Sequence, residues 1–255
     1  MKHLYHLLHV FPDRLLFRTV HYVIYAILAL LLSSCCTYYN SSTKGSENIV
    51  SKTYDFKDFD ALDISRSFDV RVIPSDTYKV VVSYNDNMAS YVEVQQHNRT
   101  LRLSVKPGSF RNLDLSATLH LPHIKKIRAS GASNITMEEY RGTDLDLNFS
   151  GATKFTAKLL QLDQLKMIAS GATHIAIEGT VQNGDIYLSG ASRFKGEQLT
   201  VSQDLSLNGS GASRINLIAN GNIDLSLSGA SHFTCEGTGS IVKSIVSGAS
   251  RLNKK

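Results

Sequence analysis

The chain has 255 residues, a formal net charge of +5, 42% hydrophobic residues, 19% charged residues, three cysteines and no tryptophan. This composition excludes an intrinsically disordered chain, a collagen, a polytopic membrane protein and a small domain that depends on disulfides. The excess of basic residues is too small to indicate a protein that binds nucleic acid.

The first segment of the chain is typical of an export signal. Lys2, Arg14 and Arg18 precede an apolar run, Val20–Leu32. A helix that spans a membrane needs about 20 apolar residues, so this run is too short for one and fits a cleaved signal better. An uncleaved, short anchor helix is the alternative. Both interpretations place the rest of the chain outside the cytoplasm.

The stretch Leu32-Ser33-Ser34-Cys35 resembles the lipobox of bacterial lipoproteins. The resemblance implies that residues 1–34 are removed as a signal peptide and that Cys35 is acylated, for example with palmitate. The lipid bilayer is then a partner of the chain, which is anchored in the cell envelope at the outer membrane, on its periplasmic or surface face. Residues 35–48 are rich in Ser, Thr and Asn and are expected to form a flexible tether. Cys36 is a weaker second candidate for acylation.

The body of the chain is a repeated unit. The tetrapeptide Ser-Gly-Ala-(Ser/Thr) recurs at intervals of 18 to 21 residues, beginning at Ser130, Ser150, Ser170, Ser189, Ser210, Ser228 and Ser247. Residues on both sides of it alternate between apolar and polar, which indicates β-strands. After each tetrapeptide a large apolar residue returns at the same place: Ile135, Phe155, Ile175, Phe194, Ile215, Phe233 and Leu252. Cys235 continues this inward face and is expected to be a buried small hydrophobe.

Two all-β architectures fit a period of about 20 residues. In a parallel β-solenoid, or β-helix, each repeat is one coil and equivalent residues stack into columns. In an antiparallel meander or barrel, each Gly-Ala would form the corner of a hairpin. We favour the solenoid, because identical side chains stabilise each other most when coils lie directly over one another. The general preference for right-handed parallel crossovers predicts a right-handed coil.

The repeats occupy residues 125–255, and residues 49–124 lack the tetrapeptide. Strand-like segments such as Phe68–Val72 and Tyr78–Val82 are separated there by turn signals. Because the end of a solenoid exposes a strand edge, an atypical terminal unit is expected to cover it. We interpret residues 49–124 as an N-terminal β cap with the first coils, which antiparallel hairpins could form in part.

These features together resemble a known family. Leu121, Pro122 and Ile124 lead into the first tetrapeptide, and Gly-Ala-(Ser/Thr) units then follow behind a lipoprotein-type signal. In this pattern the chain resembles the head GIN domain family over roughly residues 49–252. The resemblance implies a lipoprotein with an adhesin-like binding or structural module. The family offers no catalytic residues that could be assigned to this chain.

The residue directly after each tetrapeptide is basic, or can become basic, in six of the seven repeats. These residues are Lys154, His174, Arg193, Arg214, His232 and Arg251, and the first repeat has Asn134 instead. Alternation points them outward, and stacked coils would set them roughly 5 Å apart in a column. One interpretation is a solvated face whose charges are neutralised by neighbouring acids such as Asp146, Asp185 and Asp224. The other is a linear surface that binds an anionic polysaccharide or another envelope component.

A polysaccharide lyase or hydrolase of the β-helix type is the alternative function. Such enzymes need carboxylates that converge in a groove. Here Asp144, Asp185, Asp204 and Asp224 recur once per repeat at strand starts, which favours a structural role. The sequence contains no HExxH motif, nucleophile elbow or P-loop. We therefore expect no enzymatic activity, no catalytic residue, no metal, no cofactor and no nucleic-acid partner.

Overall fold

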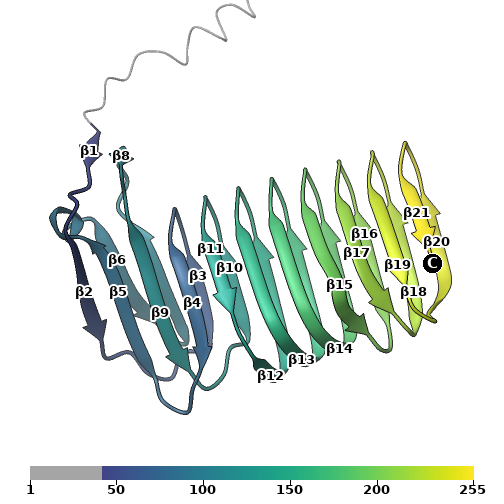
Figure 1. Cartoon of the computed structure of the whole chain (residues 1–255), viewed down its shortest axis with the longest axis horizontal. Helices are drawn as coiled ribbons and strands as arrows, with labels where there is room; N and C mark the ends of the chain where they lie inside the picture. The colour runs from purple at the N-terminus through teal and green to yellow at the C-terminus, as the bar shows by residue number, and fades with distance from the viewer. Residues whose placement is uncertain (1–41) are drawn as a thin grey trace, which may run out of the picture. The chain divides into compact units, whose positions relative to one another are not determined.

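The computed structural model describes residues 42–255, which form one folded unit of stacked β-strands (Figure 1). The predicted signal peptide, residues 1–34, and the predicted acylation site Cys35 lie outside the described residues. Every pairing between consecutive repeats is parallel, so the predicted parallel β-solenoid is confirmed and the antiparallel meander is wrong for the repeats. Within residues 42–255 no helix has the length and hydropathy that crossing a membrane requires.

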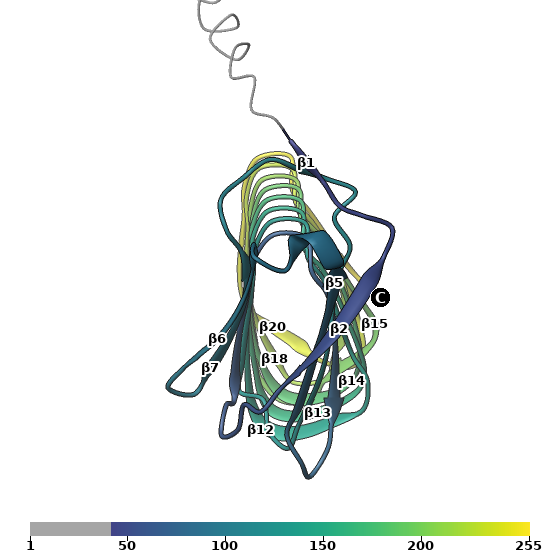
Figure 2. The same cartoon turned by 90° about the vertical axis from the view of Figure 1, so that its left-hand side faces the viewer.

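Each coil has two long walls that meet at a narrow corner, and the coils superpose when the stack is viewed along its axis (Figure 2). Wall A, which precedes the corner, contains β7 (Thr100–Val105), β3 (Ala61–Ile64), β10 (Lys126–Ala129), β16 (Leu205–Gly209), β18 (Asn222–Leu227) and β20 (Ser240–Val246). Wall B, which follows it, contains β9 (Leu115–Leu121), β4 (Asp69–Pro74), β11 (Asn134–Met137), β15 (Arg193–Val201), β17 (Arg214–Ala219), β19 (His232–Glu236) and β21 (Arg251–Lys254). Three longer strands complete the middle coils: β12 (Tyr140–Phe149), β13 (Lys154–Ala169) and β14 (His174–Leu188). β13 and β14 begin in wall B and end in wall A, so each follows its coil around the side opposite the corner.

Equivalent residues of successive repeats are register partners, as the repeat pattern predicts. The apolar residues after each corner form one continuous column in the order Ile135, Phe155, Ile175, Phe194, Ile215, Phe233 and Leu252. Phe155 and Phe194 are fully buried and Phe233 is 1% exposed, and an isoleucine separates each phenylalanine from the next. Large rings therefore alternate with smaller aliphatic side chains along the core, which fills the space between coils without crowding.

The tetrapeptide forms the corner that joins wall A to wall B. Gly151 has a φ of +73°, and a Cβ added there would lie 2.8 Å from the carbonyl oxygen of Gly131 in the preceding coil. At each later corner the alanine N–H donates to the glycine carbonyl oxygen one coil below, over 2.7 or 2.8 Å. Glycine is required here by both its backbone conformation and the close approach of the coils. The last residue of the tetrapeptide turns inward, and the Thr153 hydroxyl donates to the Ser150 carbonyl oxygen at 2.7 Å.

The N-terminal end of the stack is covered by antiparallel strands. After the coil formed by β3 and β4, the chain leaves the stack as β5 (Lys79–Asn85), which pairs antiparallel with β9, and β2 (Ile49–Tyr54) pairs antiparallel with β5. On wall A, β6 (Val92–His97) forms an antiparallel hairpin with β7. A short 3₁₀ helix, η1 (Asp86–Met88), lies between β5 and β6. These strands close the edge that the first coil would otherwise expose.

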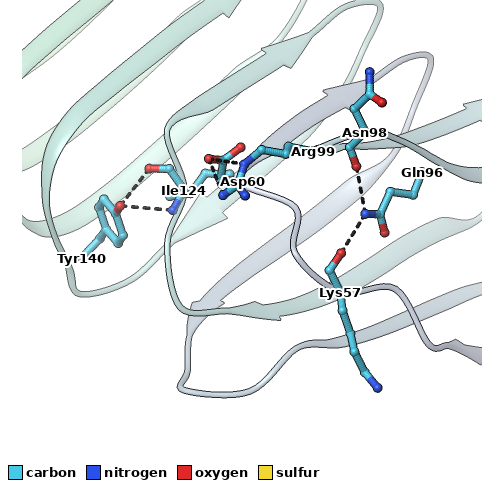
Figure 3. Close-up of polar contacts among 7 residues, drawn as sticks. All are labelled: Lys57, Asp60, Gln96, Asn98, Arg99, Ile124 and Tyr140. Atoms are coloured by element: carbon cyan, nitrogen blue, oxygen red, sulfur yellow. Dashed lines mark hydrogen bonds and ion pairs between the residues drawn. The ribbon is translucent and has the colours of Figure 1, made fainter.

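Polar contacts fix this cap to the first coils (Figure 3). Asp60, which is 8% exposed, accepts hydrogen bonds from Nε and Nη2 of Arg99 at 3.0 and 2.8 Å, and this bonding raises the pKa of Arg99. The Tyr140 hydroxyl donates to the Ile124 carbonyl oxygen at 2.8 Å and accepts from the Ile124 N–H at 3.1 Å. Burial raises the pKa of Tyr140, so the hydroxyl keeps the proton that it donates.

Part of the segment expected to form a tether, residues 35–48, contacts the cap, and residues 35–41 lie outside the described part of the chain. β1 (Thr43–Lys44) pairs in parallel with β8 (Phe110–Arg111). The side chain of Asn85 donates to the Ser46 carbonyl oxygen at 2.7 Å, and that of Asn87 donates to the Lys44 carbonyl oxygen at 2.8 Å. Residues 43–48 therefore belong to the folded unit, although their polar composition resembles that of a linker.

Candidate functional site

The six basic residues after the corners lie in one column on the outside of wall B. Register pairs join Lys154 to His174, His174 to Arg193, Arg193 to Arg214, Arg214 to His232 and His232 to Arg251. His232 is half-buried and the other five are exposed. We call this set the basic column. Adjacent paired strands are about 4.8 Å apart, so the column spans roughly 24 Å over five steps.

The glycine corner positions each member of the column. A basic residue follows directly after the inward Ser or Thr. Before four of the six, the hydroxyl donates to the serine carbonyl oxygen three residues earlier, as in Thr153, Ser192, Ser213 and Ser231, and so fixes the start of the strand. In two coils the imidazole is also held: Nδ1 of His174 lies 3.3 Å from the Ala172 carbonyl oxygen, and Nδ1 of His232 lies 3.2 Å from the Ala230 carbonyl oxygen. A carbonyl oxygen can only accept, so Nδ1 is the donor in both contacts, and Nε2 of these two residues has no hydrogen-bond partner among residues 42–255.

A pocket of about 160 Å³ lies between the basic side chains of three neighbouring coils. Lys154, His174, Arg193 and Lys195 line it, and the small side chain of Ala176 leaves the space open. Lys195 is absent from the predicted set, because only the position next to the tetrapeptide is basic in repeat after repeat. The alternation of the strand is the signal that could have found it, since Lys195 lies two residues after Arg193 and faces outward with it.

Wall A carries a different charge pattern. Four residues before each tetrapeptide, register partners alternate in sign in the first four coils: Lys126, Asp146, Lys166 and Asp185, followed by Ser206, Asp224 and Lys243. Nζ of Lys126 lies 2.7 Å from Oδ2 of Asp146, and Nζ of Lys243 lies 3.4 Å from Oδ2 of Asp224. On this wall, acids and bases neutralise each other within the column.

The expectation that Asp146, Asp185 and Asp224 neutralise the basic column is therefore wrong. These carboxylates lie on wall A, before the corner, whereas the basic column lies on wall B, after it. None of the ion pairs found between residues 42 and 255 includes a member of the basic column. Two unit charges 4 Å apart repel by about 1 kcal/mol in water, so a bound anion would relieve repulsion along the column.

The recurring carboxylates bond to neighbouring coils. Asp185 accepts a hydrogen bond from Gln164 Nε2 at 2.9 Å, and Asp204 accepts one from Asn222 Nδ2 at 3.0 Å. Across residues 42–255, no group of three or more His, Cys, Asp or Glu side chains is arranged to hold a metal ion. Cys235 is a fully buried free thiol in the core, as expected, and burial raises its pKa.

Solved structures with a similar fold come from species of Bacteroides and Parabacteroides. One titled a "putative adhesin" from Bacteroides fragilis is 19% identical, with a TM-score of 0.78, covering 84% of this chain and 100% of that one. A "putative lipid binding protein" from Parabacteroides distasonis is 16% identical, with a TM-score of 0.68 and the same coverage. A "putative adhesin" from Parabacteroides merdae is 16% identical, with a TM-score of 0.60, covering 84% and 99%. These likenesses show the fold.

The comparison with curated proteins gives no match. A family model, in contrast, matches residues 58–250, which include the first coil, the cap strands β5 and β6 and all seven glycine corners. The match thus extends over most of the stacked unit and over five of the six residues of the basic column. On this evidence the chain belongs to the family described as "Putative auto-transporter adhesin, head GIN domain".

Proposed function

We propose that this chain is an adhesin-like binding module of the cell envelope, and that its basic column binds an anionic polysaccharide. The family description supports the adhesin-like module and gives no catalytic activity. A fold by itself does not identify a ligand, so the ligand class is argued from the site. The single observation that carries the proposal is the contrast between two columns: signs alternate from Lys126 to Asp185 on wall A, while the six bases from Lys154 to Arg251 on wall B are in register with no acid between them.

The geometry favours an extended polymer over a small anion. One basic group stands at each coil, about 4.8 Å from the next, along a straight line. A polysaccharide with a carboxylate on each sugar, such as a polyuronate, presents negative groups at a comparable, regular interval. Many weak contacts then add along one chain, whereas a single exposed ion pair contributes little.

Affinity chromatography on heparin tests the proposal. We expect the double substitution Arg193→Ser and Arg214→Ser to lower the salt concentration at which the protein elutes, since it removes two neighbouring charges from the middle of the column. Salt screens such contacts, so retention should also weaken as ionic strength rises.

The matched control is the pair Arg128→Ser and Lys166→Ser, which removes two exposed charges from wall A. It changes the net charge by the same amount and should elute close to the wild-type protein. Equal losses in both double variants would show that heparin responds to net charge alone, and the basic column would then have no special role.

We also propose that the module is anchored by a lipid at Cys35, since the lipobox and the signal-like segment precede the folded unit directly. In cells fed labelled palmitate, the wild-type protein should incorporate the label and the Cys35→Ser variant should not. The Cys36→Ser variant, as the control, should keep the label. Labelling of Cys35→Ser at the wild-type level would contradict this assignment.

A further inference from the structure

A second row of residues on the outside of wall A has a composition unlike the rest of that wall. It lies two residues before each tetrapeptide and contains, in register order, Arg128, Asn148, Ile168, Tyr187, Asn208, Ser226 and Ile245. Ile168 is 38% exposed, Tyr187 42% and Ile245 55%. Two smaller polar residues, Asn208 and Ser226, therefore stand between Tyr187 and Ile245.

This change in side-chain size produces a hollow. A pocket of about 350 Å³ is lined by Ile168, Tyr187, Asn208 and Ser226, together with Ser210 and Ser228 at the edge of the glycine corner. Within the row, the lining extends from Ile168 to Ser226, which is three coil steps, or roughly 14 Å. The hollow is thus elongated along the stack and has an aromatic ring on one side.

Three polar side chains in the hollow have no hydrogen-bond partner among residues 42–255: Tyr187, Asn208 and Ser226. The Ser189 hydroxyl, also in the lining, donates to the Ala169 carbonyl oxygen at 3.5 Å. Several other outward amides on the stack are bonded to acids, as Gln164 is to Asp185 at 2.9 Å and Asn216 is to Glu197 at 2.9 Å. The Asn208 amide, the Ser226 hydroxyl and the Tyr187 hydroxyl are therefore available to a ligand.

The surroundings of the hollow favour an uncharged ligand. None of the residues that line it is charged. The nearest acids in the adjacent row are already bonded, Asp185 to Gln164 and Asp224 to Lys243. The lining itself offers an anion no cation, and a cation would have to compete with these existing contacts.

We propose that the hollow binds a neutral pyranose unit of a polysaccharide. The face of an aromatic ring is weakly negative and attracts the weakly positive C–H groups on the apolar face of a sugar ring. The amide of Asn208 can both donate to and accept from sugar hydroxyls, and the Ser226 hydroxyl can do the same. An apolar surface with a few convergent polar groups is the usual form of a small-ligand site.

This site is separate from the basic column, because the two lie on opposite walls of the coil. The hollow would bind sugars without charge, whereas the basic column is proposed to bind charged ones. The two proposals can therefore fail independently.

The absence of tryptophan from the chain provides a direct probe. In the full chain, the substitution Tyr187→Trp introduces a single indole that can stack on a sugar as tyrosine does. Its fluorescence is titrated with neutral hexasaccharides of glucose, mannose, galactose and xylose. We expect a saturable change with at least one of them. Adding Asn208→Ala should weaken that binding about fivefold, as the loss of one hydrogen bond does.

Three controls make the result decisive. Val242→Trp places the indole at another exposed position and should show no change. Calorimetry with the wild-type protein should detect the same ligand, and Tyr187→Ala should abolish binding without unfolding the protein, because this side chain is on the surface. The Arg193→Ser and Arg214→Ser variant should bind the neutral sugar normally. No response to any of the four sugars, or binding that is lost only in the arginine variant, would overturn the proposal.

Discussion

At each corner, the backbone conformation and the neighbouring coil together require glycine. Gly171 has a φ of +83°, and a Cβ added to it would lie 2.6 Å from the carbonyl oxygen of Gly151. Either feature alone disfavours an L side chain, and both recur coil after coil. The repetition of glycine in the sequence therefore follows from the stacking of backbones and needs no ligand to explain it.

We expect Gly171→Ala to lower the free energy of unfolding by more than about 1–2 kcal/mol, the cost of a left-handed conformation alone, because the added methyl group also meets backbone. The matched control is Gly184→Ala, where the nearest atom to an added Cβ is the Leu205 side chain at 3.4 Å. Denaturant unfolding measures both variants. Equal midpoints would contradict the account of the corner.

One corner departs from this rule and explains why the sequence does not reveal the first coil. Between β3 and β4 the turn contains Arg66 instead of glycine, with a φ of +68°. A Cβ on Gly131 would lie 3.0 Å from the Arg66 Cα, so Arg66 occupies the place of a corner glycine in the stack. A search for the tetrapeptide cannot find this corner, because contacts between the coils maintain its backbone conformation without a glycine.

At the scale of the strand, the inward columns were predictable and the outward charges were only partly so. The position after each tetrapeptide predicted both the buried column that contains Phe194 and the basic column beside it. The alternating ladder that contains Lys126 and Asp146 is also readable, since it stands four residues before each tetrapeptide. Which charges neutralise each other cannot be read from the sequence, because the chain passes from wall A to wall B at the corner. Acids and bases that are close in sequence are thereby separated.

The buried column makes a prediction about its largest members. Phe194 is fully buried between Ile175 and Ile215, so Phe194→Ala would leave a cavity that neighbouring coils cannot close. We expect a loss of about 3–5 kcal/mol in the free energy of unfolding. Val242→Ala, at a side chain that is 63% exposed, should change stability by less than about 0.5 kcal/mol. A Phe194→Ala variant as stable as the wild type would show that the column is not the core.

At the scale of the whole folded unit, the chain order of the N-terminal end could not be derived from the sequence. The strand-like segments predict antiparallel strands, and β2, β5 and β6 are antiparallel. The sequence predicts first coils within residues 49–124 but does not indicate that β3 and β4 form one of them, or that β10 and β11 return to pair with these strands after the cap. Such contacts join residues that are distant in the chain, and no local periodicity records them.

Because the coils stack, basic residues that are repeated along the sequence form one continuous column on the surface. The affinity of a ligand for this column should therefore depend on the length of the ligand. A short anion would meet one or two basic groups, whereas an extended polyanion could meet all six over roughly 24 Å. Length dependence is therefore a property that separates the basic column from a general positive charge.

The most direct test is a calorimetric titration of the protein with oligogalacturonates of increasing length. We predict that affinity rises with each added residue until the oligomer matches the column and then levels off, and that Arg193→Ser with Arg214→Ser weakens the rise by interrupting the column. An affinity that does not depend on length, or that is the same in this double variant as in the wild-type protein, would contradict the account.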